Sequence, residues 1–207
     1  MMIRSVAANR LVVSVSLALT LASRGTAGAE GAAPELHVFV QDCVGLNEDF
    51  LRAIQVEVEH IYTEAGVRIV WLEERPPDPV EAYQARAFVL EELPPSLRRL
   101  MSISKGRAPL AITLGPRPTE PSADIYVSRK AVLGRASYRR ALAEKHMARA
   151  LGRTLAHELA HRFLRSSHTE QGVLKATLEE RDLIDSDRSD LFWTAEQRQL
   201  LQATAMR

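Results

Sequence analysis

The sequence predicts a small α+β domain, because short apolar segments separated by turn-rich breaks precede a long helical stretch without a proline. Of its 207 residues, 46% are hydrophobic and 26% are charged. This composition is typical of a globular protein and excludes a wholly disordered, collagen-like or multi-span membrane chain. We therefore expect a small mixed sheet packed on helices.

The first 29 residues have the pattern of an export signal. Two arginines precede an apolar run at residues 11–22, and small side chains follow at Ala27 and Ala29, where a signal peptidase would cleave. The run is too short to span a bilayer comfortably, although an uncleaved membrane anchor is the alternative. We expect a signal peptide at residues 1–29 and an exported domain at residues 30–207, periplasmic or secreted, with no membrane segment in the mature form.

Charge and cysteine content exclude further classes. The chain has 27 Lys and Arg against 26 Asp and Glu, and three of the arginines lie in the first 29 residues. The remaining balance lacks the basic excess of a nucleic-acid-binding protein, so we expect no nucleic-acid partner. The single cysteine, Cys43, excludes an internal disulfide and is expected to be a small buried thiol. The oligomeric state has no signal in the sequence.

The first third of the exported chain alternates between strand and helix patterns. Residues 36–41 alternate apolar and polar side chains, which is the period of a strand. Asn47 can cap a helix whose apolar residues recur at helical spacing to about Ala65. Gly66 ends that helix, and residues 67–72 form a second apolar strand.

The middle of the chain is less regular. Residues 83–93 fit either a strand or a helix, and two prolines introduce a short helix at residues 96–101. Residues 110–114 and 123–127 are two short apolar strands on either side of a turn-rich segment.

The last part of the chain is predicted to be helical. Residues 136–164 contain no proline and only one glycine, so we expect one long helix there. A final helix begins at Thr194, with Gln197 completing a capping box. Basic side chains along this part are interpreted as a solvated helix face. They are Arg135, Arg139, Arg140, Lys145, Arg149 and Arg153.

The long helix contains an HExxH motif, His157-Glu158-Leu159-Ala160-His161. Residues four apart are separated by about 40° around a helix and about 6 Å along it, so both imidazoles can bind one zinc ion. Glu158 lies about 100° further round, where it can act as general base and acid on a water activated by the metal. The alternative is a helix face that carries two solvated histidines.

A third ligand would complete the zinc site. His168 lies 11 residues after His157, beyond a turn-prone segment that can bring the chain back. Three histidines with an open fourth position are typical of catalytic zinc. Glu179 or Glu180 is the alternative third ligand. His146 lies on the same side of the helix but about 16 Å from His157 along it, which is too far to bind the same ion.

These motifs resemble the metzincin branch of the zincin metallopeptidases, whose pattern is HExxHxxGxxH followed by a methionine turn. They also resemble small exported bacterial zinc-dependent peptidases with HExGH, a short glycine-containing turn, a histidine and Gly-Ile-Met. Residues 168–174 match the latter spacing, and weaker similarities cover most of the exported chain. The resemblance implies a zincin-like fold around a long active-site helix, with residues 123–128 as the candidate edge strand that binds substrate. The alternative for these residues is an ordinary sheet strand with Ile125 and Val127 in the core. It implies His157, His161 and His168 as metal ligands and Glu158 as the catalytic residue.

Four features depart from these patterns. Leu164 stands where metzincins have glycine, and Ala160 stands where the narrower group often has glycine. The third histidine comes one residue later than in metzincins. Leu174 replaces the methionine, which is a swap of similar volume. Each departure leaves the ligands and the base in place, but the turn after the helix must form without glycine.

The sequence therefore predicts an exported zinc metallopeptidase that hydrolyses bonds in a peptide or protein substrate, with Zn²⁺ as its cofactor. Two alternatives stay open. One is a catalytically degenerate zinc-binding protein, which Leu164 and Leu174 leave possible. The other is a metal-free exported binding module on the same scaffold.

Overall fold

The computed structural model describes most of the chain after residue 32. The described residues are 33–100, 109–114, 124–136, 143–165, 168–185, 191 and 193–206. They belong to one compact unit, Ala32–Arg207. The expected signal peptide at residues 1–29 lies outside the described residues, so it stays a prediction. In the described part of the chain, no helix is both long enough and apolar enough to cross a bilayer.

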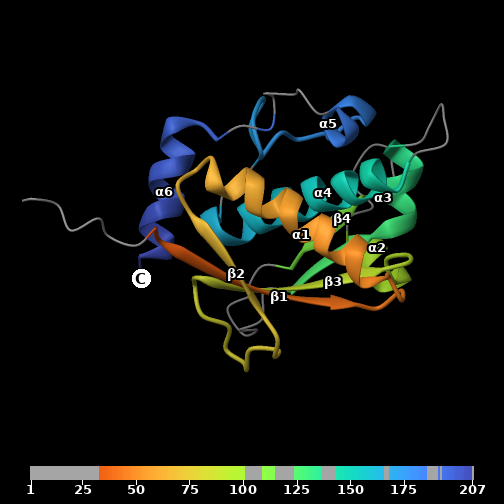
Figure 1. The fold of residues 1–207 in the computed structure, drawn as a ribbon, viewed down its shortest axis with the longest axis horizontal. Coiled ribbons are helices and arrows are strands. Elements are labelled where there is room, and N and C mark those ends of the chain that lie inside the picture. The colour runs from red at the N-terminus through yellow and green to blue at the C-terminus, as the bar shows by residue number, and fades with distance from the viewer. Residues whose placement is uncertain are drawn as a thin grey trace, which may run out of the picture. The chain divides into compact units, whose positions relative to one another are not determined.

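Strands and helices are mixed in the first part of the described chain, and the last part is helical (Figure 1). The strands are β1 (Glu35–Asp42), β2 (Arg68–Leu72), β3 (Gln84–Leu90), β4 (Ala111–Thr113) and β5 (Asp124–Ser128). The helices are α1 (Glu48–Thr63), α2 (Pro95–Leu100), α3 (Arg129–Ala136), α4 (Glu144–Leu164), α5 (Glu180–Ile184) and α6 (Ala195–Ala205).

The strands form one mixed sheet in the order β2-β1-β3-β5-β4. β1 pairs in parallel with β2 and β3, and β3 pairs in parallel with β5. β4 pairs antiparallel with β5 and ends the sheet. The segment at residues 83–93, ambiguous in sequence, is therefore the central strand β3. The expectation that residues 123–128 form the substrate-binding edge is wrong, because β5 has a partner on both sides and β4 is the edge strand.

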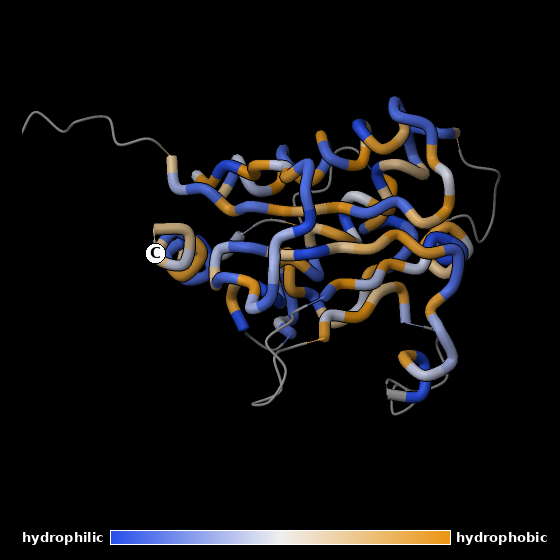
Figure 2. The backbone as a smooth tube through the Cα atoms, turned by 90° about the horizontal axis from the view of Figure 1, so that it is seen from below, coloured by the Kyte–Doolittle hydropathy of each residue, from blue (hydrophilic) through white to orange (hydrophobic). Residues whose placement is uncertain are grey.

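α1 and α4 cover one face of the sheet (Figure 1). Alternate residues of the central strands point toward these helices and are buried, and Figure 2 shows hydrophobic residues recurring along the strands. They include Leu36, Val38, Ala85, Ala87, Ile125 and Val127. Arg86 of β3 and Asp124 of β5 are partners in the strand register and form a buried ion pair, in which the Arg86 Nε lies 2.7 Å from the Asp124 Oδ1. Alternation along each strand thus sends its apolar residues into the helix-facing core.

Two local expectations fail. The single helix expected at residues 136–164 is wrong. α3 begins directly after β5, where the Ser128 hydroxyl accepts a hydrogen bond from the Ala131 N–H at 3.2 Å. α4 starts only after Ala143, whose backbone is extended.

The expectation of a buried thiol is also wrong, because Cys43 is exposed. β1 ends at Asp42, whose carboxylate accepts hydrogen bonds from two backbone N–H groups beyond it and so turns the chain away from the sheet.

The helices α1 and α4 approach each other closely at Gly152. A Cβ atom added there would lie 2.7 Å from the Cβ of Glu57 and 2.9 Å from the carbonyl oxygen of Ile54. We expect Gly152→Ala to lower the free energy of unfolding by about 1–3 kcal/mol, because the two helices would have to separate. Urea denaturation measures this change.

Gly134→Ala is the matched control. Gly134 lies in α3 with open space around the position of a new Cβ, so alanine should raise stability slightly through its higher helix propensity. Equal effects of the two substitutions would contradict the close approach of α1 and α4.

Candidate metal centre

The HExxH motif lies in the buried C-terminal half of α4. His157 and Glu158 are only 6% and 8% exposed. Tyr62 of α1 holds this part of the helix in place, because its hydroxyl donates a hydrogen bond to the Ala156 carbonyl at 3.2 Å. The Tyr62 ring packs edge-on against Trp193 from the segment before α6. The ligand-bearing turn of the helix is therefore held from α1 and from the C-terminal segment.

The three histidines of the sequence prediction come together. Each histidine offers one ring nitrogen as a metal ligand, and these three nitrogens all lie within 4.8 Å of one another. The Nε2 atoms of His157 and His161 are 3.1 Å apart. Two nitrogens bound about 2.0–2.1 Å from one tetrahedral zinc ion lie about 3.3 Å apart. The spacing and the all-imidazole donor set therefore fit zinc.

The tautomer of His157 is fixed by a backbone contact. Its Nδ1 lies 2.7 Å from the Val173 carbonyl oxygen. A carbonyl can only accept, so Nδ1 carries the proton and Nε2 presents its lone pair toward the other two histidines. Burial lowers the pKa of His157 to about 3, and burial also lowers the pKa of His168. Both rings are therefore neutral near pH 7, the form that binds a metal.

His168 reaches the site through a turn without glycine. α4 ends at Leu164, and its C-cap Arg165 takes a left-handed backbone conformation with φ 50° and donates its N–H to the His161 carbonyl. Arg165 lies three residues before His168, as the glycine of the HExxHxxGxxH pattern lies three residues before its last histidine. Relative to that pattern, the left-handed residue and the third histidine both come one position later in this chain. This shift explains why leucine is tolerated at position 164 and why the third histidine is His168.

Glu158 has a partner that the sequence does not reveal. The hydroxyl of Thr113, on the edge strand β4, lies 2.5 Å from the Glu158 Oε2 and 3.2 Å from the Glu158 carbonyl oxygen. Burial raises the pKa of Glu158, and the Thr113 hydrogen bond partly opposes this shift. An isolated threonine in a short apolar strand carries no sequence signal, because only the sheet brings it to α4.

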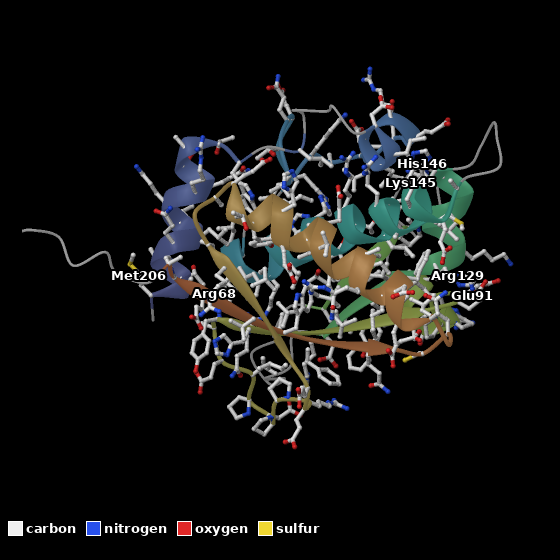
Figure 3. The ribbon with its side chains drawn as sticks, in the orientation of Figure 1. Arg68, Glu91, Arg129, Lys145, His146 and Met206 are labelled. Atoms are coloured by element: carbon white, nitrogen blue, oxygen red, sulfur yellow. The ribbon has the colours of Figure 1, made fainter. Side chains whose placement is uncertain are left out.

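The alternative ligands lie elsewhere. Glu179 is the N-cap of α5, where it forms a capping box with Asp182. Within the described residues, neither Glu179 nor Glu180 belongs to the histidine group. His146 lies beside Lys145 at the N-terminal end of α4 (Figure 3), far along the helix from the motif. Leu174, in place of the methionine, is fully buried in the core.

No protein-family model and no curated protein matches the sequence. Similar solved structures include archaemetzincin from Methanopyrus kandleri, which is 15% identical, with a TM-score of 0.50 over 86% of this chain and 98% of that chain. At this identity the similarity concerns the fold. The five-stranded mixed sheet with its helices matches the archaemetzincin fold, which confirms the expected α+β, zincin-like fold class.

The neutral state of His157 predicts a pH dependence of stability. A histidine in the unfolded chain has a pKa of about 6.5, whereas folding lowers that of His157 to about 3. Its contribution to stability is therefore complete above about pH 6.5 and is lost as the pH falls toward 3. We expect metal-free wild-type protein to lose more stability on acidification than His157→Asn, whose amide can replace Nδ1–H.

Urea denaturation at several pH values in the presence of a chelator measures this difference. The comparison with His157→Asn isolates one residue, because every other titratable group is present in both proteins. Identical pH profiles would show that His157 is not held neutral by burial.

Proposed function

We propose that this protein is an exported zinc metallopeptidase. The observation that carries the proposal is the convergence of three imidazoles on one point, with the buried carboxylate of Glu158 on the helix that carries two of them. The metzincin-like fold supports the same function. Export rests on the pattern of residues 1–29 in the sequence.

His157, His161 and His168 would hold the zinc ion. When bound, zinc lowers the pKa of a water molecule and polarises the carbonyl of the scissile peptide. As neutral ligands, the three imidazoles would add no negative charge to the site and so would not weaken this effect. His168 is exposed, which leaves the open side of the site accessible to a peptide.

Glu158 would move the proton. Its carboxylate accepts a proton from the attacking water and returns it to the leaving amine. Burial raises its pKa and so favours holding the proton between these two steps. Thr113 donates to Oε2, so its hydroxyl orients the carboxylate without using Oε1.

The sheet edge suggests how a substrate is held. β4 ends the sheet, and its residue Thr113 contacts the proposed base. An extended peptide that adds to this edge would place its backbone beside Glu158. We therefore propose peptides or unfolded protein segments as substrates.

The Glu158→Gln variant tests the reaction. Zinc content is measured by elemental analysis, and cleavage is measured on denatured casein and on a mixed peptide library by mass spectrometry. We expect about one zinc per chain in wild type and variant, and about 10²- to 10⁴-fold slower cleavage in the variant because only the base is lost. His161→Ala, which removes a ligand, should lose zinc as well.

Other results would identify the alternatives. Zinc bound by wild type without cleavage of either probe would indicate a catalytically degenerate zinc protein. No zinc in folded wild type, even after reloading, would indicate a metal-free binding module.

The contact between Thr113 and Glu158 predicts a second kinetic effect. Thr113→Val removes the hydroxyl but keeps the shape, so we expect kcat to fall about tenfold or more, as for loss of a hydrogen bond to a charged group. Thr113→Ser keeps the donor and should stay close to wild type. Zinc content and KM should change little in both. Equal kcat values for the two variants would contradict this role.

A further inference from the structure

His168 begins a closed loop, residues 168–176, which we call the metal loop. Its neck is closed by two backbone hydrogen bonds: the Thr169 N–H donates to Leu174, and the Ala176 N–H donates to Thr169. Thr169 and Lys175 face each other across this neck as bridge partners. His168 therefore directly precedes Thr169, the residue that pairs with Lys175 to close the loop.

The metal loop touches the centre at two points. It carries His168 at its start, and near its tip the Val173 carbonyl accepts the hydrogen bond from His157 Nδ1 at 2.7 Å. The buried side chains of Val173 and Leu174 anchor the part of the loop beside the neck in the core. The exposed His168 is part of the neck, so its position depends on what holds the neck.

A buried acid holds that neck. The Lys175 ammonium lies 2.8 Å from Oδ2 of Asp182, a residue with no exposed surface. The same oxygen accepts the N–H of Glu179 at the start of α5. A buried carboxylate is stable only when paired and hydrogen-bonded, so Lys175 and Asp182 constrain each other strongly.

Asp182 is in turn fixed to α4. Its carbonyl oxygen accepts a hydrogen bond from Arg153 at 2.8 Å, and Arg153 pairs with Glu57 of α1 at 2.7 Å. Arg153 lies one helical turn before His157. It is 6% exposed, so the expectation of a solvated basic face is wrong for this residue. A continuous chain of polar contacts thus runs from α1 through α4 to the metal loop.

We propose that Lys175 is a positioning residue of the metal centre. Its ion pair with Asp182 holds the neck of the metal loop against α4, and so sets His168 relative to the two histidines of the helix. This inference rests on the metal site of the proposed function. It assigns to Lys175 a role in metal affinity, although its side chain touches none of the three histidines in any contact described.

The zinc dissociation constant tests this role. Competition with a chromophoric chelator at pH 7.5 gives the constant for wild type, Lys175→Met and Lys175→Arg. We expect binding at least tenfold weaker in Lys175→Met, which keeps the apolar stem but loses the charge. Lys175→Arg keeps the ion pair and should recover most of the affinity. The Co²⁺ absorption spectrum reports whether the ligand geometry has changed.

Two controls separate positioning from stability. Lys130→Met breaks an ion pair between Lys130 and Glu92 at an exposed site, and should leave zinc affinity unchanged. Val38→Ala destabilises the core at β1 and should also leave the affinity of the folded protein unchanged. Circular dichroism confirms that each variant is folded, and Lys175→Gln replaces Lys175→Met where the latter fails to fold.

The outcomes are distinct. Wild-type affinity in folded Lys175→Met or Lys175→Gln, or equal weakening in Val38→Ala, overturns the positioning role and leaves the proposed peptidase intact. No zinc binding by wild type overturns the proposed function and this inference together. Weak binding by Lys175→Met with recovery in Lys175→Arg supports the inference.

Discussion

The burial of α4 is the constraint on which the rest of the structure depends. This helix carries two of the histidines and the carboxylate, and it packs against α1 closely enough that Gly152 leaves no room for a Cβ. The sheet lies on one side of α1 and α4, and β4 reaches α4 through Thr113. The segment after α4 then has to return across the helix to supply His168 and the Val173 carbonyl. The site is thus assembled from elements that share one buried helix.

Burial also sets the chemistry of the site. Removing charge from water disfavours the ionised form of each group, so the pKa of His157 falls and that of Glu158 rises. Both shifts act in the direction that metal-assisted hydrolysis requires: neutral imidazoles bind the ion, and a carboxylate of raised pKa takes up a proton more readily. The hydrogen bonds from Thr113 and to Val173 orient the same two side chains. Solvation and orientation are therefore supplied together by the packing around α4.

What the sequence predicts well is what local geometry determines. The HExxH spacing places two imidazoles on one side of any helix, and alternation along residues 36–41 requires a strand. Contacts between distant segments had no comparable signal: Thr113 approaches Glu158 only through the order of the sheet. The left-handed Arg165 and the burial of Arg153 depend on tertiary contacts in the same way. The prediction of one long helix fails because helical propensity alone does not show where a chain leaves a sheet and turns.

Binding of one zinc ion by three histidines is the basis of the proposed function. X-ray absorption spectroscopy at the zinc edge of the loaded protein observes these ligands. We expect a first shell of nitrogen and oxygen at about 2.0–2.1 Å, with outer-shell scattering from three imidazoles. A sulfur ligand at about 2.3 Å, which only Cys43 or a methionine could supply, or scattering from fewer than three imidazoles, would contradict this expectation.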